Sequence, residues 1–492
     1  MKKIVLIEAG EPRTINIFRK AKLPRLGLLL LGKILKNLGK EVKIYYEDIA
    51  PINWSDVLSA DLVGISSLTS TATRAYEIVQ KIKIARHNIP VVKGGPHVTF
   101  LPEEALQQGA DFVVRGEGEK TTVELVQWLE DRSEKSIEEI LGLSYRIGNK
   151  IFHNPPRPLL SSEELDLLPF PDLSLIERFK MSPTIPVLTS RGCPFNCKFC
   201  SVTKMFGGEY KFRSVENVIE ELKELKIQFP RFGKSSSDLF FYDDNFAAKP
   251  ERTKRLLRAM IDEGLLISWS AQTRVDVSKD LELLELMKKS GCEWLYLGLE
   301  SVNPQTLKDF QKRQSVEDIE KGVPIIRGFG IRTLGQFIIG GESDDPFTAQ
   351  NTVQFAKRLK LDAAQLWILT PIPGTPIFQE LDEQNRILYK GPEHWWRYNM
   401  EQVVINPKGM SSRELQLSVL FKALPQFYST WRWVKKGLKM MGNFFSFTSW
   451  KSKRISLENF VLYLYARRLL KRGKNSLKSH LKELEEKVKS EN

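Results

Sequence analysis

Two successive series of alternating strand and helix patterns constrain the fold of this 492-residue chain more than any other feature. In the first series, five short apolar runs have strand character, at residues 4–7, 42–45, 62–65, 90–93 and 112–114. Between them, stretches such as residues 26–38 and 75–85 carry apolar side chains at helical spacing. The alternation predicts an α/β fold that begins with a doubly wound parallel sheet over residues 1–145.

A proline-rich stretch separates this series from the second. We expect residues 146–182 to be a linker, because proline fits poorly inside either kind of element. Six more strand patterns follow, at residues 185–190, 239–243, 268–273, 294–300, 333–339 and 364–370, with helical patterns between them. Six such units predict a (β/α)6 partial barrel over residues 183–385, with its chemistry at the carboxyl ends of the strands.

Small and polar residues follow three strands of the predicted first sheet. They are Ser66, Ser67 and Thr69 after the third strand, Gly94 and Gly95 after the fourth, and Gly116 and Gly118 after the fifth. Any one of these glycines could simply be part of a turn. Three such loops at one edge favour a ligand site, because open α/β sheets bind ligands at the carboxyl ends of their strands.

Three of the four cysteines form a CxxxCxxC motif directly after the first strand of the predicted barrel: Cys193, Cys197 and Cys200. A structural zinc site takes four protein ligands, whereas a [4Fe–4S] cluster can be held by three thiolates and keep one iron open. The fourth cysteine, Cys292, directly precedes an apolar run, so we expect it in the core. The motif therefore predicts a [4Fe–4S] cluster.

With this motif the second region resembles the radical SAM superfamily, whose open iron takes S-adenosylmethionine. The resemblance extends through residues 242–246, 298–301, 337–342 and 370–376. It implies that Phe199 lies by the adenine, that Glu300 reaches the ribose, and that glycines such as Gly340 let the backbone approach the cofactor.

Two neighbouring carboxylates depart from the pattern of that superfamily. Asp243 and Asp244 stand where it usually has a Gly-Gly-Glu element for the amino group of S-adenosylmethionine. We assign both to S-adenosylmethionine binding, with a helix N-cap pair as the alternative.

The first region is similar to the cobalamin-binding domain of B12-dependent radical SAM enzymes, on residues 65–69, 93–97 and 114–119. The resemblance implies a Rossmann-like cobalamin domain and adds Glu117 to its binding loops. Other B12 domains ligate cobalt with a histidine after the first strand, but no histidine lies between Glu8 and Arg25, so cobalamin is expected without that ligand. A nucleotide-type fold that has lost its cofactor is the alternative. We expect His97 to be a hydrogen-bonding group of its loop.

Most of the net charge of +14 belongs to the end of the chain. Residues 431–492 hold 16 Lys and Arg against 5 Asp and Glu, with Trp431, Trp433 and Trp450 among them. We expect residues 386–492 to form a helical, aromatic and basic region. An amphipathic helix on anionic lipid is favoured over a cap on the barrel, and single-stranded nucleic acid is the least favoured partner.

The resemblance implies an enzyme that uses a [4Fe–4S] cluster, S-adenosylmethionine and cobalamin to methylate an unactivated carbon of a small-molecule or lipid substrate. A flavodoxin or ferredoxin would supply electrons. Cobalamin-dependent cyclisation or rearrangement without methyl transfer is one alternative. Modification of tRNA is another, weakened because such enzymes usually bring extra cysteines. Without a signal peptide or a long apolar run, we expect a cytoplasmic protein, with peripheral contact to the inner membrane face.

Overall fold

The computed structural model describes residues 1–10, 23–131, 135–179, 184–229, 239–429 and 480–484. The first domain contains a seven-stranded sheet of order β2-β1-β3-β4-β5-β6-β7. Its first five strands are parallel and lie where the sequence predicts them. These five are β1 (Lys3–Glu8), β2 (Glu41–Tyr46), β3 (Leu62–Ser66), β4 (Val91–Gly94) and β5 (Phe112–Val114).

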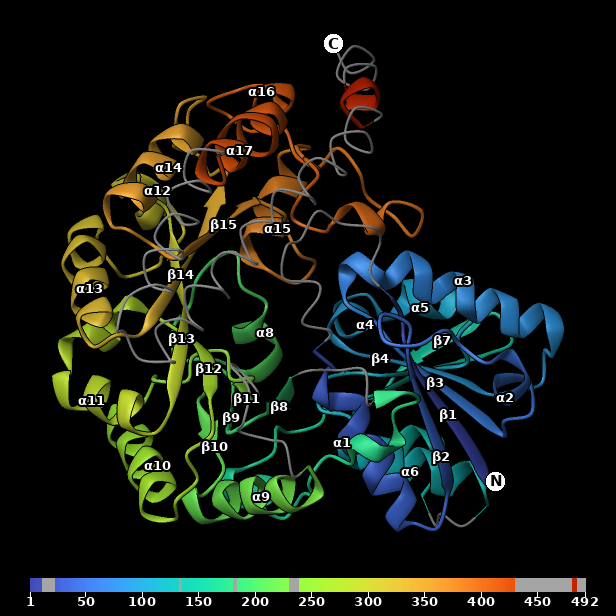
Figure 1. The fold of residues 1–492 in the computed structure, drawn as a ribbon. Helices are drawn as coiled ribbons and strands as arrows, with labels where there is room; N and C mark the ends of the chain where they lie inside the picture. Colours follow the sequence, from blue (N-terminus) through green and yellow to red (C-terminus); the bar gives the residue numbers. More distant parts are fainter. Residues whose placement is uncertain (11–22, 132–134, 180–183, 230–238, 430–479, 485–492) are drawn as a thin grey trace.

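Helices cover both faces of this sheet, as a doubly wound fold requires (Figure 1). The helices are α1 (Leu26–Asn37), α2 (Trp54–Leu58), α3 (Thr69–Ala85), α4 (Pro96–Phe100), α5 (Pro102–Gln107) and α6 (Glu119–Leu129). Alternate residues of β1 serve the two faces: Leu6 packs in the cluster that contains Leu29 of α1, and Ile7 in the cluster that contains Ile78 of α3. Both faces are therefore buried, which explains the continuous apolar runs.

A hairpin of β6 (Leu143–Ile147) and β7 (Lys150–His153) extends the sheet in the antiparallel sense. The expected boundary at residue 145 falls inside it. Gly148, at a φ of 58°, makes the turn, and the rings of Tyr145 and Phe152 stack across the hairpin with their centroids 5.3 Å apart. The rest of the proline-rich stretch contains the short helix α7 (Ser162–Asp166) and a 3-10 turn at Leu173–Leu175.

The second domain is the predicted partial barrel, an all-parallel sheet of order β15-β14-β13-β12-β11-β8. Its strands are β8 (Ile185–Val187), β11 (Leu239–Phe241), β12 (Trp269–Thr273), β13 (Cys292–Glu300), β14 (Arg332–Ile339) and β15 (Ala363–Ile368). The short strands β9 (Ser190–Arg191) and β10 (Lys211–Phe212) pair beside it.

Helices line the outer side of the barrel, most of them away from the first domain (Figure 1). They are α9 (Val215–Gln228), α10 (Pro250–Asp262), α11 (Leu281–Lys289), α12 (Pro304–Asp309), α13 (Val316–Gly328) and α14 (Thr348–Arg358). The short helix α8 (Val202–Phe206) lies on the side of the barrel that faces the first domain.

The start of the C-terminal region is packed structure. It comprises α15 (Pro376–Glu383), a 3-10 turn at Trp395–Arg397, α16 (Ser412–Gln416), a π-helix at Leu417–Ala423 and α17 (Leu424–Phe427). Trp395 and Tyr398 are each 1% exposed, so these aromatic side chains are core residues. The basic tail, with its expected amphipathic helix, lies outside the described residues except for residues 480–484, where His480 is buried against Arg397.

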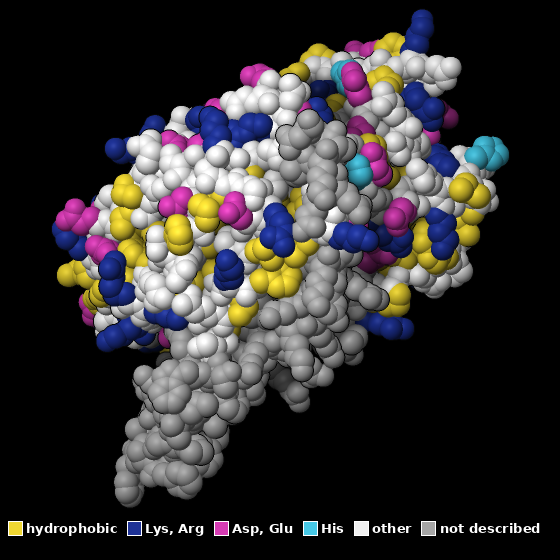
Figure 2. Space-filling view, turned by 90° about the horizontal axis from the view of Figure 1, so that it is seen from above, with side chains coloured by type: hydrophobic (Ala, Val, Ile, Leu, Met, Phe, Trp, Pro, Cys, Tyr) yellow, Lys and Arg dark blue, Asp and Glu magenta, His cyan; other side chains and the backbone are white. Residues whose placement is uncertain are grey.

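In the part of the chain that the structure describes, no helix is both long and apolar enough to cross a membrane. On the face shown in Figure 2, basic and acidic side chains are interspersed, with hydrophobic side chains between them. This mixture agrees with the near balance of charges before residue 431.

Candidate functional site

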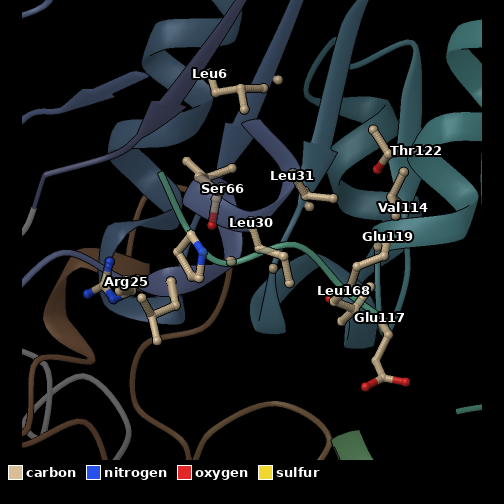
Figure 3. Close-up of a pocket in the computed structure, with 18 of the residues that line it drawn as sticks. Leu6, Arg25, Leu30, Leu31, Ser66, Val114, Glu117, Glu119, Thr122 and Leu168 are labelled. Atoms are coloured by element: carbon tan, nitrogen blue, oxygen red, sulfur yellow. The ribbon is translucent and has the colours of Figure 1, made fainter. Parts of the chain in front are cut away.

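A cavity of about 380 Å³ lies under the carboxyl edge of the first sheet. Leucines of β1 and α1, among them Leu6, Leu30 and Leu31, form its apolar wall (Figure 3). The cavity also reaches the barrel, where Tyr242 and Asp244 line it. Two sheet edges from separate domains therefore border one largely apolar space.

Six of the residues assigned to cobalamin line this cavity: Ser66, Gly94, Gly95, Gly116, Glu117 and Gly118. Gly116 has a φ of 70°, and a Cβ there would meet no atom within 4 Å, so its backbone faces open space. Gly95 has a φ of 99°, and its Cβ would lie 2.9 Å from the Ser67 carbonyl oxygen. Both positions need glycine for their backbone conformation.

The other two cobalamin candidates lie behind the cavity wall. Ser67 is fully buried and accepts a hydrogen bond from Lys93 Nζ at 3.0 Å. Thr69 begins α3, and its Oγ1 is 3.3 Å from His97 Nδ1. Burial lowers the pKa of Lys93, which also lines the cavity, to about 7.

His97 is a hydrogen-bonding group, as expected, and its main partner comes from α5. Its Nε2 lies 3.2 Å from Glu104 Oε1 and 3.2 Å from the Tyr76 hydroxyl. Trp395 Nε1 of the C-terminal region donates to the same carboxylate. The loop Gly95–His97 thus rests on a buried network that the sequence pattern did not reveal.

The cysteine motif lies on a loop whose backbone is tightly confined. Gly192 has a φ of 84°, and a Cβ there would collide with the Glu209 carbonyl oxygen. Cys197 is buried, and Cys193 and Cys200 are half-buried. Burial raises the pKa of all three thiols, that of Cys200 to about 12, and the charges of the other two cysteines add to the rise at Cys200.

The donor set fits a [4Fe–4S] cluster held by three thiolates. Within the described residues, no three His, Cys, Asp or Glu side chains are grouped closely enough to hold a single metal ion. Cys292 is fully buried at the first residue of β13, so the length of that strand, roughly 26 Å at 3.3 Å per residue, separates it from the carboxyl edge. Its burial agrees with the expected core role.

Glu300, the residue assigned to the ribose, ends β13 at a bulge and has a φ of 61°. Its Oε1 accepts a hydrogen bond from Lys312 Nζ at 2.6 Å, in a pair whose side chains are 10% and 8% exposed. Left-handed backbone is uncommon for glutamate and costs energy that the surrounding contacts must offset. Lys312 is thus the partner of a predicted site residue, and sequence reasoning did not identify it.

Phe199, assigned to the adenine, packs edge to face against Phe310 with ring centroids 5.2 Å apart. Gly340, with a φ of 108°, donates its backbone N–H to Asp344 Oδ2 at 2.9 Å, and a Cβ there would lie 2.8 Å from Leu415. The amide of Gly340 is therefore engaged within the protein.

The two neighbouring aspartates do different things. Asp243 is fully buried, and it accepts hydrogen bonds from the backbone N–H and hydroxyl of Thr189 and from the backbone N–H of Ser190. Asp244 lines the cavity with its side chain exposed to that space, and the surrounding protein, with a contribution from the charge of Asp243, raises its pKa to about 7. The N-cap alternative is wrong, because α10 begins at Pro250 with Lys249 in the N-cap position.

Arg191 joins the two halves of the site and was also missed. Its Nη1 donates to Glu117 Oε1 at 2.5 Å, and its Nη2 donates to Glu119 Oε1 at 2.6 Å. The signal that could have found it is its place directly before the cysteine motif, opposite the acidic run Glu117-Gly118-Glu119.

Comparison with known proteins gives matches over both domains. The radical SAM superfamily model matches residues 187–352, and the B12 binding domain model matches residues 12–126. An uncharacterized methyltransferase from Pyrococcus horikoshii is 36% identical over 417 residues, covering 82% of this chain and 88% of the relative. Bacteriochlorophyllide d C-12(1)-methyltransferase from Chlorobaculum tepidum is 29% identical over 387 residues, covering 78% and 77% of the two chains.

A solved structure supports the fold. The cobalamin-dependent S-adenosylmethionine radical enzyme OxsB, with aqua-cobalamin and S-adenosylmethionine bound, superposes with a TM-score of 0.67 at 16% identity. The superposition covers 98% of this chain and 83% of that one.

Proposed function

This chain belongs to the cobalamin-dependent radical SAM enzymes of the methyltransferase kind, and we propose from that premise that it methylates an unactivated carbon of a small-molecule or lipid substrate. Its cofactors are a [4Fe–4S] cluster, S-adenosylmethionine and cobalamin. When bound, they supply reductive cleavage of S-adenosylmethionine, hydrogen abstraction and a transferable methyl group.

The observation that carries the proposal is the shared cavity. It is bordered by the loops after β3, β4 and β5 on one side and by Arg191, Tyr242 and Asp244 of the barrel on the other. A reaction that needs both cofactors requires that their sites open into one space from which water is excluded. The leucines of β1 and α1 supply the apolar wall.

We assign the cluster to Cys193, Cys197 and Cys200, and cobalamin to the six cavity-lining loop residues. Ser67 and Thr69 would support those loops from behind. Of the two aspartates assigned to S-adenosylmethionine, we keep Asp244, which would accept a hydrogen bond from the amino group. Asp243 would instead anchor the end of β8, because Thr189 and Ser190 already donate to it. Glu300 would accept the ribose hydroxyls, held in place by Lys312. Phe199 would pack on the adenine, and Gly340 would shape the nearby backbone.

The finer parts of the proposal concern partners. The +11 charge of residues 431–492 would attract anionic lipid, which suits a cytoplasmic enzyme that visits the inner membrane face for an apolar substrate. An electron donor of the flavodoxin or ferredoxin kind would reduce the cluster. Nucleic acid is not among the proposed partners.

The test uses S-adenosylmethionine with a deuterated methyl group. Protein reconstituted anaerobically with iron, sulfide and hydroxocobalamin is incubated with reductant and with polar and lipid extracts in separate reactions. We expect deoxyadenosine and a product that has gained the labelled methyl group, both lost in Cys197→Ala. A cofactor-loaded protein whose product carries no label would contradict methyl transfer and favour cyclisation or rearrangement.

A further inference from the structure

We propose that Arg191 is a positioning residue that fixes the separation between the cobalamin loop and the cluster loop, by binding Glu117 and Glu119 at once. This inference rests on the proposed function, because it concerns the gap that the methyl group must cross. The cofactor assignments do not include this contact, because Arg191 is neither a cluster ligand nor part of the glycine-containing loops of the first domain.

Arg191, Glu117 and Glu119 form a contact that we call the fork. The two terminal nitrogens of one guanidinium reach one oxygen of each of two carboxylates, at 2.5 Å and 2.6 Å. Arg191 is 12% exposed, and Glu117 and Glu119 are 7% and 9% exposed. Because the guanidinium is planar and its donors are fixed, two such bonds set both the distance and the orientation of the partner loops.

Each arm of the fork is tied to one cofactor site. Glu117 lies between Gly116 and Gly118 on the cavity wall, and its other oxygen accepts the backbone N–H of Leu160 at 2.6 Å. Arg191 is two residues before Cys193, and Lys211 pairs with it across β9 and β10. A shift of the guanidinium would therefore move the first cluster ligand relative to the cobalamin loop.

The second oxygen of Glu119 gives an independent indication that this wall faces a ligand. Glu119 Oε2 is buried and, among the described residues, has no hydrogen-bond partner. Glu119 itself lines the cavity, as does Glu117 (Figure 3), and Gly118 between them in the chain is also a lining residue. A buried carboxylate oxygen without a donor is costly, and the amide side chains of a corrin carry N–H groups that could satisfy it.

Other contacts between the domains lie elsewhere, so the fork is separable from domain packing. Phe100 of α4 packs where a Cβ on Gly374 would be, and Thr73 Oγ1 of α3 donates to the Pro392 carbonyl oxygen at 2.6 Å. None of these residues lines the cavity. Loss of the fork should therefore leave the domains joined but the gap between the cofactors poorly defined.

The test variants are Arg191→Lys and Glu119→Gln. Lysine keeps the charge but cannot span both carboxylates, and glutamine keeps the shape but removes one charge. The matched control is Arg157→Lys. Arg157 is 13% exposed and binds Glu124 and Thr121 in the first domain, but it does not line the cavity.

The measurement is the magnetic interaction between the reduced cluster and Co(II) cobalamin, by electron paramagnetic resonance of protein loaded with both. Iron and corrinoid contents and thermal unfolding are measured in parallel. We expect the wild type to show a defined interaction. Both fork variants should keep the two cofactors, because the carbonyl oxygen of Glu119→Gln can still accept from a corrin amide, but their interaction should be weakened or broadened. Arg157→Lys should lower the melting temperature without changing the interaction.

Three outcomes would overturn the inference. The first is that both fork variants retain the wild-type interaction. The second is that both lose the cofactors, which would make the fork an element of the fold. The third is that Arg157→Lys broadens the interaction equally. A wild type that binds no corrinoid, or that holds both cofactors without any interaction, would instead count against the proposed function.

Discussion

Trp395 Nε1 donates to both oxygens of Glu104, at 2.8 Å and 3.0 Å, although 291 residues separate the two in the chain. The indole belongs to the C-terminal region and the carboxylate to α5 of the first domain. Glu104 also accepts from the Tyr76 hydroxyl at 2.7 Å and lies 3.2 Å from His97 Nε2. The C-terminal region therefore completes the network that supports the Gly95–His97 loop, which is proposed to bind cobalamin.

Replacing Trp395 with phenylalanine should destabilise the protein by about 1–3 kcal/mol, because it removes a donor from the partly buried carboxylate of Glu104. The free energy of unfolding in urea measures the loss. Trp396→Phe, in a half-buried neighbour, should cost less. Equal costs at the two positions would mean that the bond to Glu104 contributes nothing beyond burial of the ring.

The same network predicts a loss of stability in acid. Burial lowers the pKa of His97 in the folded protein. Below pH 6.5, the ordinary pKa of histidine, the unfolded chain therefore binds a proton more readily than the folded chain, and the folded state loses stability. Burial opposes ionisation of Glu104, but hydrogen bonds from His97, Tyr76 and Trp395 outweigh it and lower its pKa. A carboxyl of this kind contributes stability above its ordinary value of 4.5 and loses it as pH falls through the folded value.

The free energy of unfolding should therefore begin to fall as pH drops through 6.5 and fall further below 4.5. Urea titrations at several pH values measure this. In His97→Gln, the part of the decline that begins near pH 6.5 should be reduced. An unchanged decline in that variant would assign it to other groups.

Alanine at Cys193, Cys197 or Cys200 should each remove most of the cluster, which in the wild type should hold about four iron and four sulfide after anaerobic reconstitution. Cys292→Ala should keep the cluster and lose about 1 kcal/mol of stability, because it leaves a small void in the core. Iron and sulfide analysis decides. Loss of the cluster in Cys292→Ala would end the argument for an open iron.

Gly116→Asn should weaken binding of hydroxocobalamin by about tenfold or more, equivalent to about 1.4 kcal/mol. Asparagine tolerates the left-handed backbone at this position, so the change fills the cavity rather than straining the loop. Gly39→Asn is the control, since Gly39 has a φ of 78° and equally open surroundings but does not line the cavity. Absorbance titration measures both, and equal affinities would show that the loop after β5 is only a turn.

Asp243→Asn and Asp244→Asn should have opposite effects on the cofactor-free protein at about pH 8. In Asp243→Asn, an amide replaces a carboxylate that accepts three hydrogen bonds, and the loss of stability should be about 2 kcal/mol. In Asp244→Asn, a neutral amide replaces a carboxylate whose pKa is raised to about 7. A raised carboxyl pKa removes stability as pH increases, so Asp244→Asn should raise the melting temperature at about pH 8 more than at about pH 5, by a small amount because solvent screens this exposed side chain. Its cleavage of S-adenosylmethionine should nevertheless fall. Scanning calorimetry and deoxyadenosine release measure the two effects.

The sequence alone located the parallel strands because strands buried on both faces leave continuous apolar runs. The hairpin of β6 and β7 was missed, although Gly148-Asn149 is a turn signal, because a short polar run carries little periodicity. Predicted site residues that belong to a sequence motif lie at the expected edge of the sheet; Gly116, for example, lines the cavity there.

The partners of those residues were not predictable. Asp243 and Asp244 are identical in type, and only the fold decides that the first accepts from Thr189 while the second faces the cavity. Lys312 and Trp395 reach the site through tertiary contacts, and their local sequence carries no pattern that distinguishes them from any other lysine or core tryptophan.

The confined backbone at Gly192 has a consequence for assembly. Its shape is imposed by the carbonyl of Glu209 and by the absence of a side chain, neither of which depends on iron. We therefore expect the backbone directly before Cys193 to keep its shape in the iron-free chain. We expect oxygen damage to be repairable by delivering fresh iron and sulfide, together with a thiol reductant, to the intact protein, without passing through an unfolded state.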